Sequence, residues 1–470
     1  MEDKIEYPIL KNHYTRLCYP FLFDKQNFKT LRASVLKVPG IKEICNDKNV
    51  ESWKSEYFLP PLRRVWYPHY LPEGHLKKEL KPEDIIGHFE LPIMSVDMVK
   101  SGSGTIVFNN SPIEIQFENI LLDISYLGIG FITIEIKLKE ERSTFDKLLI
   151  MNSALRMTSR STDIDVDGKK VTIGGIFDSI LDSFRGAMGW SDRSAETKDI
   201  VLYGDLNDIF YDRVLCFSYS CIEGSIYDHE DDLFIKYWQL WNPEVNSILS
   251  DIGTEKDYGF DRSKYHLSMW KHAIYGFSKE GMVVFSDGND SFNEKILPIY
   301  FGSYYYDIFL IAVVQRMVLL RINRQLSHTE KMSGIDRKNY NAVIQIRRDL
   351  LEFANKCVFT QASNYELGQL IWRKLKDVFE MEDLLSEVKS QCDELSGYME
   401  ASRQALINDF MNILSYIVIP ASLILAIFSS NFLELQNVSL KSNWVSFAFI
   451  AAFILAFVVW QVLKRKEKKD

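Results

Sequence analysis

The sequence predicts a mixed α/β cytosolic domain, then a long α-helical stalk, then two transmembrane helices. Three observations lead to this fold class. Strand-like stretches alternate with helix-compatible segments over residues 1–301, whereas only a helical pattern continues over residues 302–409. Two long runs without any charged residue follow, at 410–433 and 443–463. A short basic tail, 464–470, comes after them.

Residues 1–301 are predicted to form one α/β domain. The stretches ENILLDISYL and GFITIEIKLK are typical of strands, and the pairs Asp167-Gly168 and Asp287-Gly288 are typical of tight turns. Segments such as STFDKLLIMNSALRMTSR have the pattern of helices between strands. With 47% hydrophobic and 25% charged residues, the 470-residue chain has the composition of a globular protein with a substantial core.

Charge and cysteine usage indicate a cytosolic domain without a nucleic-acid partner. The net charge of −9 disfavours nucleic-acid binding, because contacts to phosphates need a basic surface. The six cysteines lack paired spacing, which is typical of reduced thiols and not of a disulfide framework. The start, MEDKIEYPIL, lacks the apolar segment of a signal peptide.

Residues 302–363 are predicted to form a helical pair, and residues 364–409 a stalk helix. Apolar residues of the stalk recur every three or four positions, as on one face of a helix. A helix unbroken from Asn364 to Asn431 would have 68 residues and a length of ~100 Å. Such an amphipathic helix needs a partner, either copies of itself or its own domain, and the pattern leaves both open.

The two uncharged runs predict a membrane hairpin. With 24 residues at 410–433 and 21 at 443–463, each can cross a hydrocarbon core of ~30 Å. The alternative is a pair of buried core helices. The basic tail KRKEKKD is expected on the cytoplasmic side of the inner membrane. Because a hairpin returns the chain to the side it left, the N-terminus is also expected in the cytoplasm.

A polar stripe runs along one side of the first apolar run. Its members follow alternating steps of four and three residues, which places them on one seam of a helix. They are Asn408, Asn412, Ser415, Ile419, Ser422, Ala426 and Ser429. Such a stripe predicts either the wall of a water-filled pore shared by several subunits or a contact between helices. The stripe spans the whole run, which favours the pore, with Ile419 as an apolar ring that closes it by dewetting.

The segment IPASLILAIFSSNF resembles the end of the first transmembrane helix in the CorA family of divalent-cation channels. In that family a proline precedes a Tyr-Gly-Met-Asn signature. Here Pro420 and Asn431 are eleven positions apart, with Phe428, Ser429 and Ser430 in the Tyr-Gly-Met places. The resemblance covers residues 364–470. It implies a funnel-shaped homopentamer in the lipid bilayer, with Ser429, Ser430 and Asn431 at the far mouth of the pore and Mg²⁺ or another divalent cation as the permeant ion.

The departures from this family indicate a different gating input. Ser429-Ser430 replaces Gly-Met, and Glu434 is the only acid in the outer loop. In this respect the chain resembles the divergent CorA-like membrane effectors of type III CRISPR systems, and the resemblance implies gating by a nucleotide second messenger, a conjugate of S-adenosylmethionine with AMP, in antiviral defence. One alternative is a constitutive or Mg²⁺-regulated transporter of magnesium or other divalent cations. Another is a non-conducting, membrane-anchored binding protein.

A messenger of this type needs cations for phosphate, an aromatic or apolar slot for adenine and a carboxylate for an amino or sulfonium group. Three short groups in the α/β domain offer such side chains. They are Arg156 and Arg160, which we expect four apart on one helix; Asp212 and Arg213, at the start of a strand; and Trp270, Lys271 and His272, before another strand. The alternative for each group is an ordinary ion pair or a satisfied residue at the rim of the domain.

No enzymatic motif is found in the sequence. The patterns GxGxxG, GxxxxGK[ST] and GxSxG are absent, and His69 and His75 lack the spacing of a common zinc motif. We therefore predict no catalytic residues, no protein-bound metal and no bound cofactor.

Overall fold

A computed structural model describes residues 7–44, 56–68, 81, 85–108, 111–158, 162–188, 214–229, 262–330 and 337–431. In the last of these ranges, the side chains after Pro420 are described only at Ser422. The chain divides into two compact units. Unit 1 consists of residues 1–325 and 348–389, and unit 2 of residues 326–347 and 390–470. The second predicted transmembrane helix, 443–463, and the tail, 464–470, lie outside the described residues.

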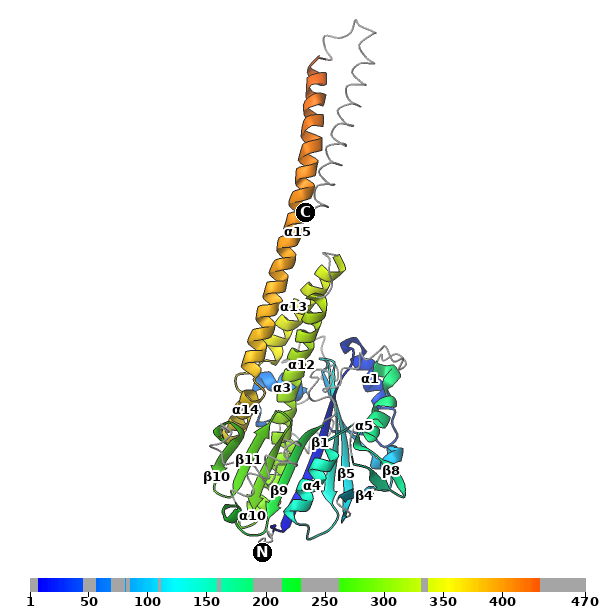
Figure 1. The fold of residues 1–470 in the computed structure, drawn as a ribbon, viewed down its shortest axis with the longest axis vertical. Coiled ribbons are helices and arrows are strands. Elements are labelled where there is room, and N and C mark those ends of the chain that lie inside the picture. The colour runs from blue at the N-terminus through cyan, green and yellow to red at the C-terminus, as the bar shows by residue number, and fades with distance from the viewer. Residues whose placement is uncertain are drawn as a thin grey trace. The chain divides into compact units, whose positions relative to one another are not determined.

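The predicted mixed α/β domain is confirmed, and its described strands form one sheet in unit 1 (Figure 1). The order is β10-β11-β12-β9-β1-β6-β5-β4-β7-β8, with β3 beside β5 and β2 beside β3. Among the described strands, β9 and β12 pair in parallel and the other pairs are antiparallel. The strands are β1 (Leu10–Leu22), β2 (Lys42–Glu43), β3 (Ile86–Leu91), β4 (Ser103–Phe108), β5 (Ser111–Ser125), β6 (Ile129–Leu138), β7 (Ile164–Val166), β8 (Lys169–Val171), β9 (Leu215–Ile222), β10 (His266–Trp270), β11 (Ala273–Ser278) and β12 (Gly281–Asp287).

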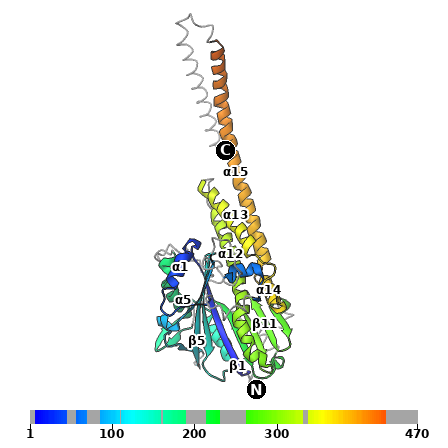
Figure 2. The ribbon, with the colours of Figure 1, turned by 180° about the vertical axis from the view of Figure 1, so that it is seen from behind.

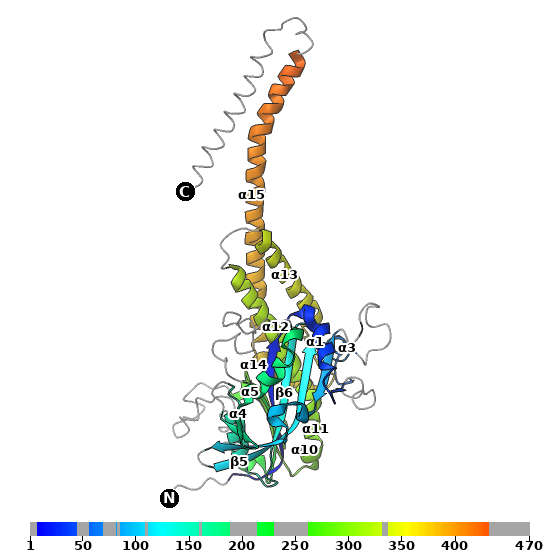
Figure 3. The same ribbon diagram turned by 90° about the vertical axis from the view of Figure 1, so that its right-hand side faces the viewer.

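The central strand β1 is covered by helices on both of its faces, because its successive side chains point to opposite sides. On one face, the ring of Tyr19 stacks on Phe177 of α5 (Ile173–Asp182) at 4.8 Å between ring centroids. On the other face, the hydroxyl of Tyr14 donates to the carbonyl of Pro298 over 2.8 Å. Figure 2 shows the sheet from behind, and Figure 3 shows α4 and α5 on one side of it with α10 and α11 on the other.

The helices that cover the two faces come from different parts of the chain. Those of the first face follow β6 and β8, whereas those of the second face follow β12. The first set is α4 (Phe145–Leu155), α5 and α6 (Arg185–Met188); the second is α10 (Ser291–Lys295), α11 (Leu297–Tyr300), the π-helical turn η10 (Phe301–Tyr305) and α12 (Tyr306–Glu330). The remaining described α-helices are α1 (Phe28–Val35), α3 (Pro60–Trp66), α9 (Arg262–Tyr265), α13 (Arg337–Cys357), α14 (Glu366–Val378) and α15 (Met381–Asn431).

Within the described part of the chain, the helical segment Leu297–Ser327 is long and apolar enough to cross a membrane. However, 78% of its most apolar window is buried inside the protein. The ring of Phe301 at its start stacks on Phe217 of β9 at 4.0 Å. This segment therefore serves as the core helix against the sheet, and the compact unit extends well past the boundary predicted at residue 301.

The expectation of one unbroken helix from Asn364 to Asn431 is wrong. Helix α14 ends at Val378, and α15 begins at Met381. Between them, Glu380 adopts a left-handed backbone with φ of 53°, which stops an α-helix. The carboxylate of Glu380 accepts a hydrogen bond from Lys279 over 2.7 Å, and this bond keeps its pKa below the usual range.

In unit 2, α15 packs along α13 of the same chain. The guanidinium of Arg403 donates to the hydroxyl of Tyr340 over 3.1 Å and lies 5.1 Å from the centre of its ring. Ten residues earlier in α15, Asp393 lies 3.8 Å from Arg347. The two helices are thus antiparallel neighbours. The stalk sequence therefore has a partner within its own chain on one of its faces.

Candidate functional site

The predicted pore stripe lies on α15. In the single chain, the side chains of Asn408, Asn412, Ser415, Ile419 and Ser422 are all exposed. The backbone remains helical as far as Asn431. The side chains of the other predicted pore residues, Ala426, Ser429, Ser430 and Asn431, lie outside the described part of the structure.

The two described hydroxyl groups of the stripe donate hydrogen bonds to the helix that carries them. The Oγ of Ser415 donates to the carbonyl of Met411, and the Oγ of Ser422 donates to that of Ile419, both over 2.8 Å. Such bonds lower the free energy needed to bring a hydroxyl into apolar surroundings. The hydroxyl oxygens still have lone pairs for water or a hydrated ion.

Large apolar side chains surround the stripe on the rest of the helix. They are exposed in the single chain, and Tyr416 reaches 73%. The others are Leu406, Ile407, Phe410, Met411, Ile413, Leu414, Ile417 and Val418. An apolar surface of this extent is unfavourable in water, so this part of α15 requires lipid or further protein around it.

The stripe lies on the side of α15 opposite to the face packed on α13. Met399 is buried one helical turn before Arg403, which contacts Tyr340 of α13, and Asn408 follows Met399 by nine positions. At about 100° per residue, nine positions turn the helix by about half a revolution. Continued back along α15, the stripe meets exposed residues that are small or polar. They are Gln404, Ala401, Gly397, Glu394 and Ser390. One narrow, hydrophilic face thus extends from Ser390 to Ser422.

Only Arg156 of the predicted arginine pair lies within the described residues, and Arg160 lies outside them. Helix α4 ends at Leu155, and Arg156 is its C-cap. The side chain of Arg156 is 0% exposed, with Nη1 3.0 Å from the Oε2 of Glu280. Arg156 is therefore a buried structural cation. The predicted pair Asp212 and Arg213 also lies outside the described residues.

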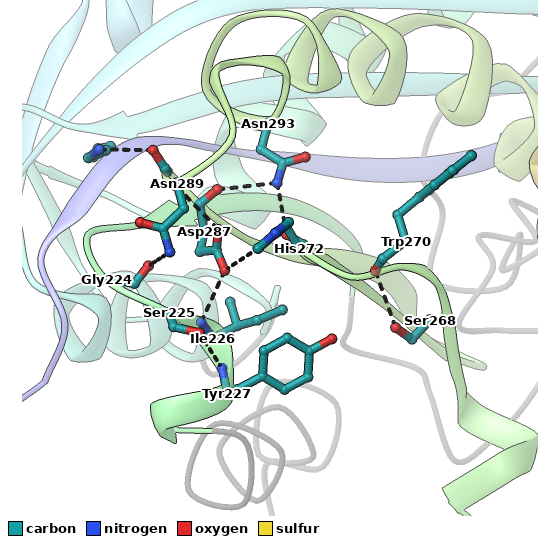
Figure 4. A network of polar contacts seen from close by, with 12 residues as sticks. Gly224, Ser225, Ile226, Tyr227, Ser268, Trp270, His272, Asp287, Asn289 and Asn293 are labelled. Carbon is teal, nitrogen blue, oxygen red and sulfur yellow. Dashed lines mark hydrogen bonds and ion pairs between the residues drawn. The ribbon is translucent and has the colours of Figure 1, made fainter.

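Trp270 and Lys271 lie at the end of β10, an edge strand of the described sheet. Trp270 is 59% exposed and its backbone carbonyl accepts from Ser268 over 3.5 Å. Figure 4 shows its ring pointing away from His272 and Asp287. The structure therefore does not bring Trp270 or Lys271 together with Arg156.

A polar network beside Trp270 was not predicted from the sequence. The Nδ1 of His272 lies 3.1 Å from the Oδ2 of Asp287, which also accepts from the backbone N–H of Ile226 over 3.4 Å (Figure 4). The amide of Asn293 donates to the carbonyls of His272 and Asp287. Asp287 had been interpreted only as a turn residue. The carboxylate of Asp287 is fully buried, and its bonds join the loops that follow β9, β10 and β12.

Comparison with protein-family models, curated proteins and solved structures finds no match to this chain. Among the described residues, no group of three or more histidine, cysteine or acidic side chains is arranged to hold a metal ion.

Proposed function

We propose that this protein is a CorA-like ion channel of the cytoplasmic membrane, formed by several copies of the chain around a central pore. The observation that carries the proposal is the surface of α15 between Phe410 and Ser422. Apolar side chains suited to lipid cover most of that surface, while a polar stripe suited to water follows one side. A single helix cannot enclose a water-filled passage, so the stripe needs symmetry-related copies.

The packing of α13 supports this orientation of the helix. Because α13 occupies the face that contains Met399, the opposite face is left for neighbouring copies and the pore. From Ser390 to Gln404 that face has only small and polar residues. The α15 helices of neighbouring copies can therefore come close to the axis of the assembly without blocking the passage along it. The resemblance to the CorA family favours a homopentamer, with the second apolar run, 443–463, as an outer helix.

The proposed gate is a ring of Ile419 side chains. It is the only branched apolar member of the stripe between Asn408 and Ser429, so it forms the driest constriction and can block ions by dewetting. The neutral oxygens of Asn412 and Ser415 can hold a hydrated cation, since Mg²⁺ gives up its waters reluctantly. By the same resemblance, we propose a nucleotide second messenger of the S-adenosylmethionine–AMP type as the opening ligand and antiviral defence as the role.

Flux through proteoliposomes that contain the full-length protein tests the proposal. We expect Mg²⁺ or monovalent cation flux only after addition of the S-adenosylmethionine–AMP conjugate. Replacing Ser415 and Ser422 together by leucine should abolish that flux and leave the oligomer intact in chemical cross-linking. Tyr416→Leu is the control, because it places a leucine beside the stripe and not on it, and it should conduct normally.

The other outcomes separate the alternatives. Flux without any nucleotide would favour a constitutive divalent-cation transporter. If the oligomer never conducts, with or without the double leucine substitution, the result would favour a membrane-anchored binding protein. If the chain is monomeric in lipid, the proposal of a shared pore is wrong.

A further inference from the structure

A cavity of about 340 Å³ lies in unit 1. It is bordered by residues 25–29 at the start of α1, by the β5–β6 turn and by helices α12 and α13. Its walls combine cationic, acidic and aromatic side chains. The charged ones are Lys25, Lys29, Arg321, Asp349 and Glu352, and the aromatic ones are Phe28, Tyr126 and Phe353. This volume is at the lower end of the range for small-molecule sites.

Two cations of the wall come from distant parts of the sequence. The Nζ of Lys25 lies 2.9 Å from the Oδ2 of Asp349. The Nη1 of Arg321 donates to the carbonyl of Leu127 over 2.7 Å. A guanidinium has five N–H groups, so this one bond orients Arg321 and leaves it further donors for an anion.

The β5–β6 turn is shaped to admit the guanidinium. Gly128 has φ of 76°, and a Cβ at this position would lie 3.1 Å from the Nη1 of Arg321 and 2.6 Å from the carbonyl oxygen of Phe23. A larger residue would therefore displace Arg321 or strain the turn. Burial lowers the pKa of Arg321, yet the group stays charged at neutral pH because an arginine starts far above that range.

The aromatic residues provide flat apolar surface next to these cations. Phe28 and Phe353 are buried, and the Tyr126 hydroxyl lies 3.9 Å from the Sγ of Cys357. A planar heterocycle gains from such rings, a phosphate gains from paired cations, and sugar hydroxyls or an amino group gain from carboxylates. A nucleotide combines all three kinds of group in one molecule of suitable size.

We propose that this cavity binds a nucleotide, with its phosphate on Lys25 and Arg321 and its base against Phe28, Tyr126 or Phe353. In the structure, Asp349 forms an ion pair with Lys25, one of the two cations proposed to bind the phosphate. Binding therefore exchanges the Lys25–Asp349 ion pair for contacts with phosphate.

This exchange acts on α13, the helix that packs along the proposed pore helix. Asp349 is on α13, two residues after Arg347, which lies 3.8 Å from Asp393 of α15. Releasing Asp349 from Lys25 removes one of the contacts that hold α13 in its present position. The gating role of the cavity rests on the proposed function, whereas nucleotide binding itself does not.

Calorimetry on the full-length protein in detergent, with AMP, adenosine and inorganic phosphate as probes, tests binding. We expect AMP to bind at least about tenfold more tightly than either fragment, because it alone uses both kinds of contact. Lys25→Gln and Arg321→Gln should each weaken AMP binding by about tenfold or more. Asp349→Asn should strengthen it, since it frees Lys25. Arg142→Gln, at an exposed ion pair with Glu223, is the matched control and should bind as the unmodified protein does.

Lys25 is half exposed, so Lys25→Gln should fold even if Arg321→Gln does not. Undetectable AMP binding at millimolar concentration, or unchanged binding by Lys25→Gln and Asp349→Asn, would overturn the site. If the protein conducts but does not bind AMP, the proposed nucleotide site is wrong and the proposed channel stands. If it binds AMP through Lys25 but never conducts, the site stands and the proposed channel is wrong.

Discussion

The Nη1 of Arg156 lies 3.0 Å from the Oε2 of Glu280, and both side chains are buried in unit 1. Arg156 caps α4, while Glu280 belongs to the turn between β11 and β12. The backbone carbonyl of the same glutamate accepts from the N–H of Cys216 in β9 over 2.9 Å. The ion pair thus joins α4, on one face of the sheet, to the turn that precedes β12. Strand β12 forms the parallel pair with β9.

Arg156→Met should strongly destabilise the protein. The substitution removes one partner of a buried ion pair, which typically lowers the free energy of unfolding by about 3–5 kcal/mol. Thermal unfolding of the full-length protein should show a much lower midpoint. Adding Glu280→Gln should recover part of the loss. Arg142→Met removes the exposed pair with Glu223 and should change the midpoint little; equal effects of the two arginine substitutions would contradict the structural role of Arg156.

His13 should make stability depend on pH. Burial, followed by the charge of Lys137, lowers the pKa of His13 to about 4, and its Nε2 accepts from the backbone N–H of Leu138 over 3.0 Å. Between the ordinary histidine value of about 6.5 and this lower value, the unfolded chain binds a proton that the folded chain does not. Stability should therefore fall as pH decreases through that window, by an upper bound of about 3 kcal/mol.

The control for this prediction is His13→Gln, whose side-chain oxygen can still accept a hydrogen bond but does not titrate. Unfolding midpoints measured from pH 7 to pH 4 should fall less steeply for this variant. A parallel decline in both proteins would assign the acid sensitivity to other groups.

Gly281→Ala should disrupt the parallel pair of β9 and β12. A Cβ at Gly281 would lie 1.9 Å from the carbonyl oxygen of Cys216, a backbone atom that cannot move aside cheaply. We expect a large drop in the thermal midpoint. Gly397→Ala is the contrasting case: this exposed glycine of α15 has nothing within 4 Å of its added Cβ, so alanine should stabilise the helix by about 1 kcal/mol. A mild effect at Gly281 would mean that the two strands are farther apart than described.

Glycine and alanine at Glu380 should differ in stability. Both substitutions remove the hydrogen bond from Lys279 and the contact 3.9 Å from Lys264. Only glycine also relieves the left-handed backbone, worth about 1–2 kcal/mol. Glu380→Gly should therefore melt above Glu380→Ala. Identical melting would indicate that the break between α14 and α15 is not strained at this residue.

Local patterns in the sequence were enough to predict many elements. The pair Asp167-Gly168 was expected to be a tight turn, and the structure has φ of 53° and 79° there between β7 and β8. Periodic apolar residues predicted the helices after residue 302. Patterns failed where distant contacts decide the outcome. Arg156 was interpreted as a surface ligand residue, but its burial depends on Glu280, more than a hundred positions away.

The sequence by itself determined some of the strands and helices, such as β5, β6 and α4, and where a polar stripe interrupts an apolar run, because those properties depend on neighbours within a few residues. The tertiary structure alone decided the position of β9 between β1 and β12, the break at Glu380 and the cavity that brings Lys25 to Asp349. These features come from contacts between residues far apart in the chain. Their energies depend on packing and on which charges become buried together, and no local pattern contains that information.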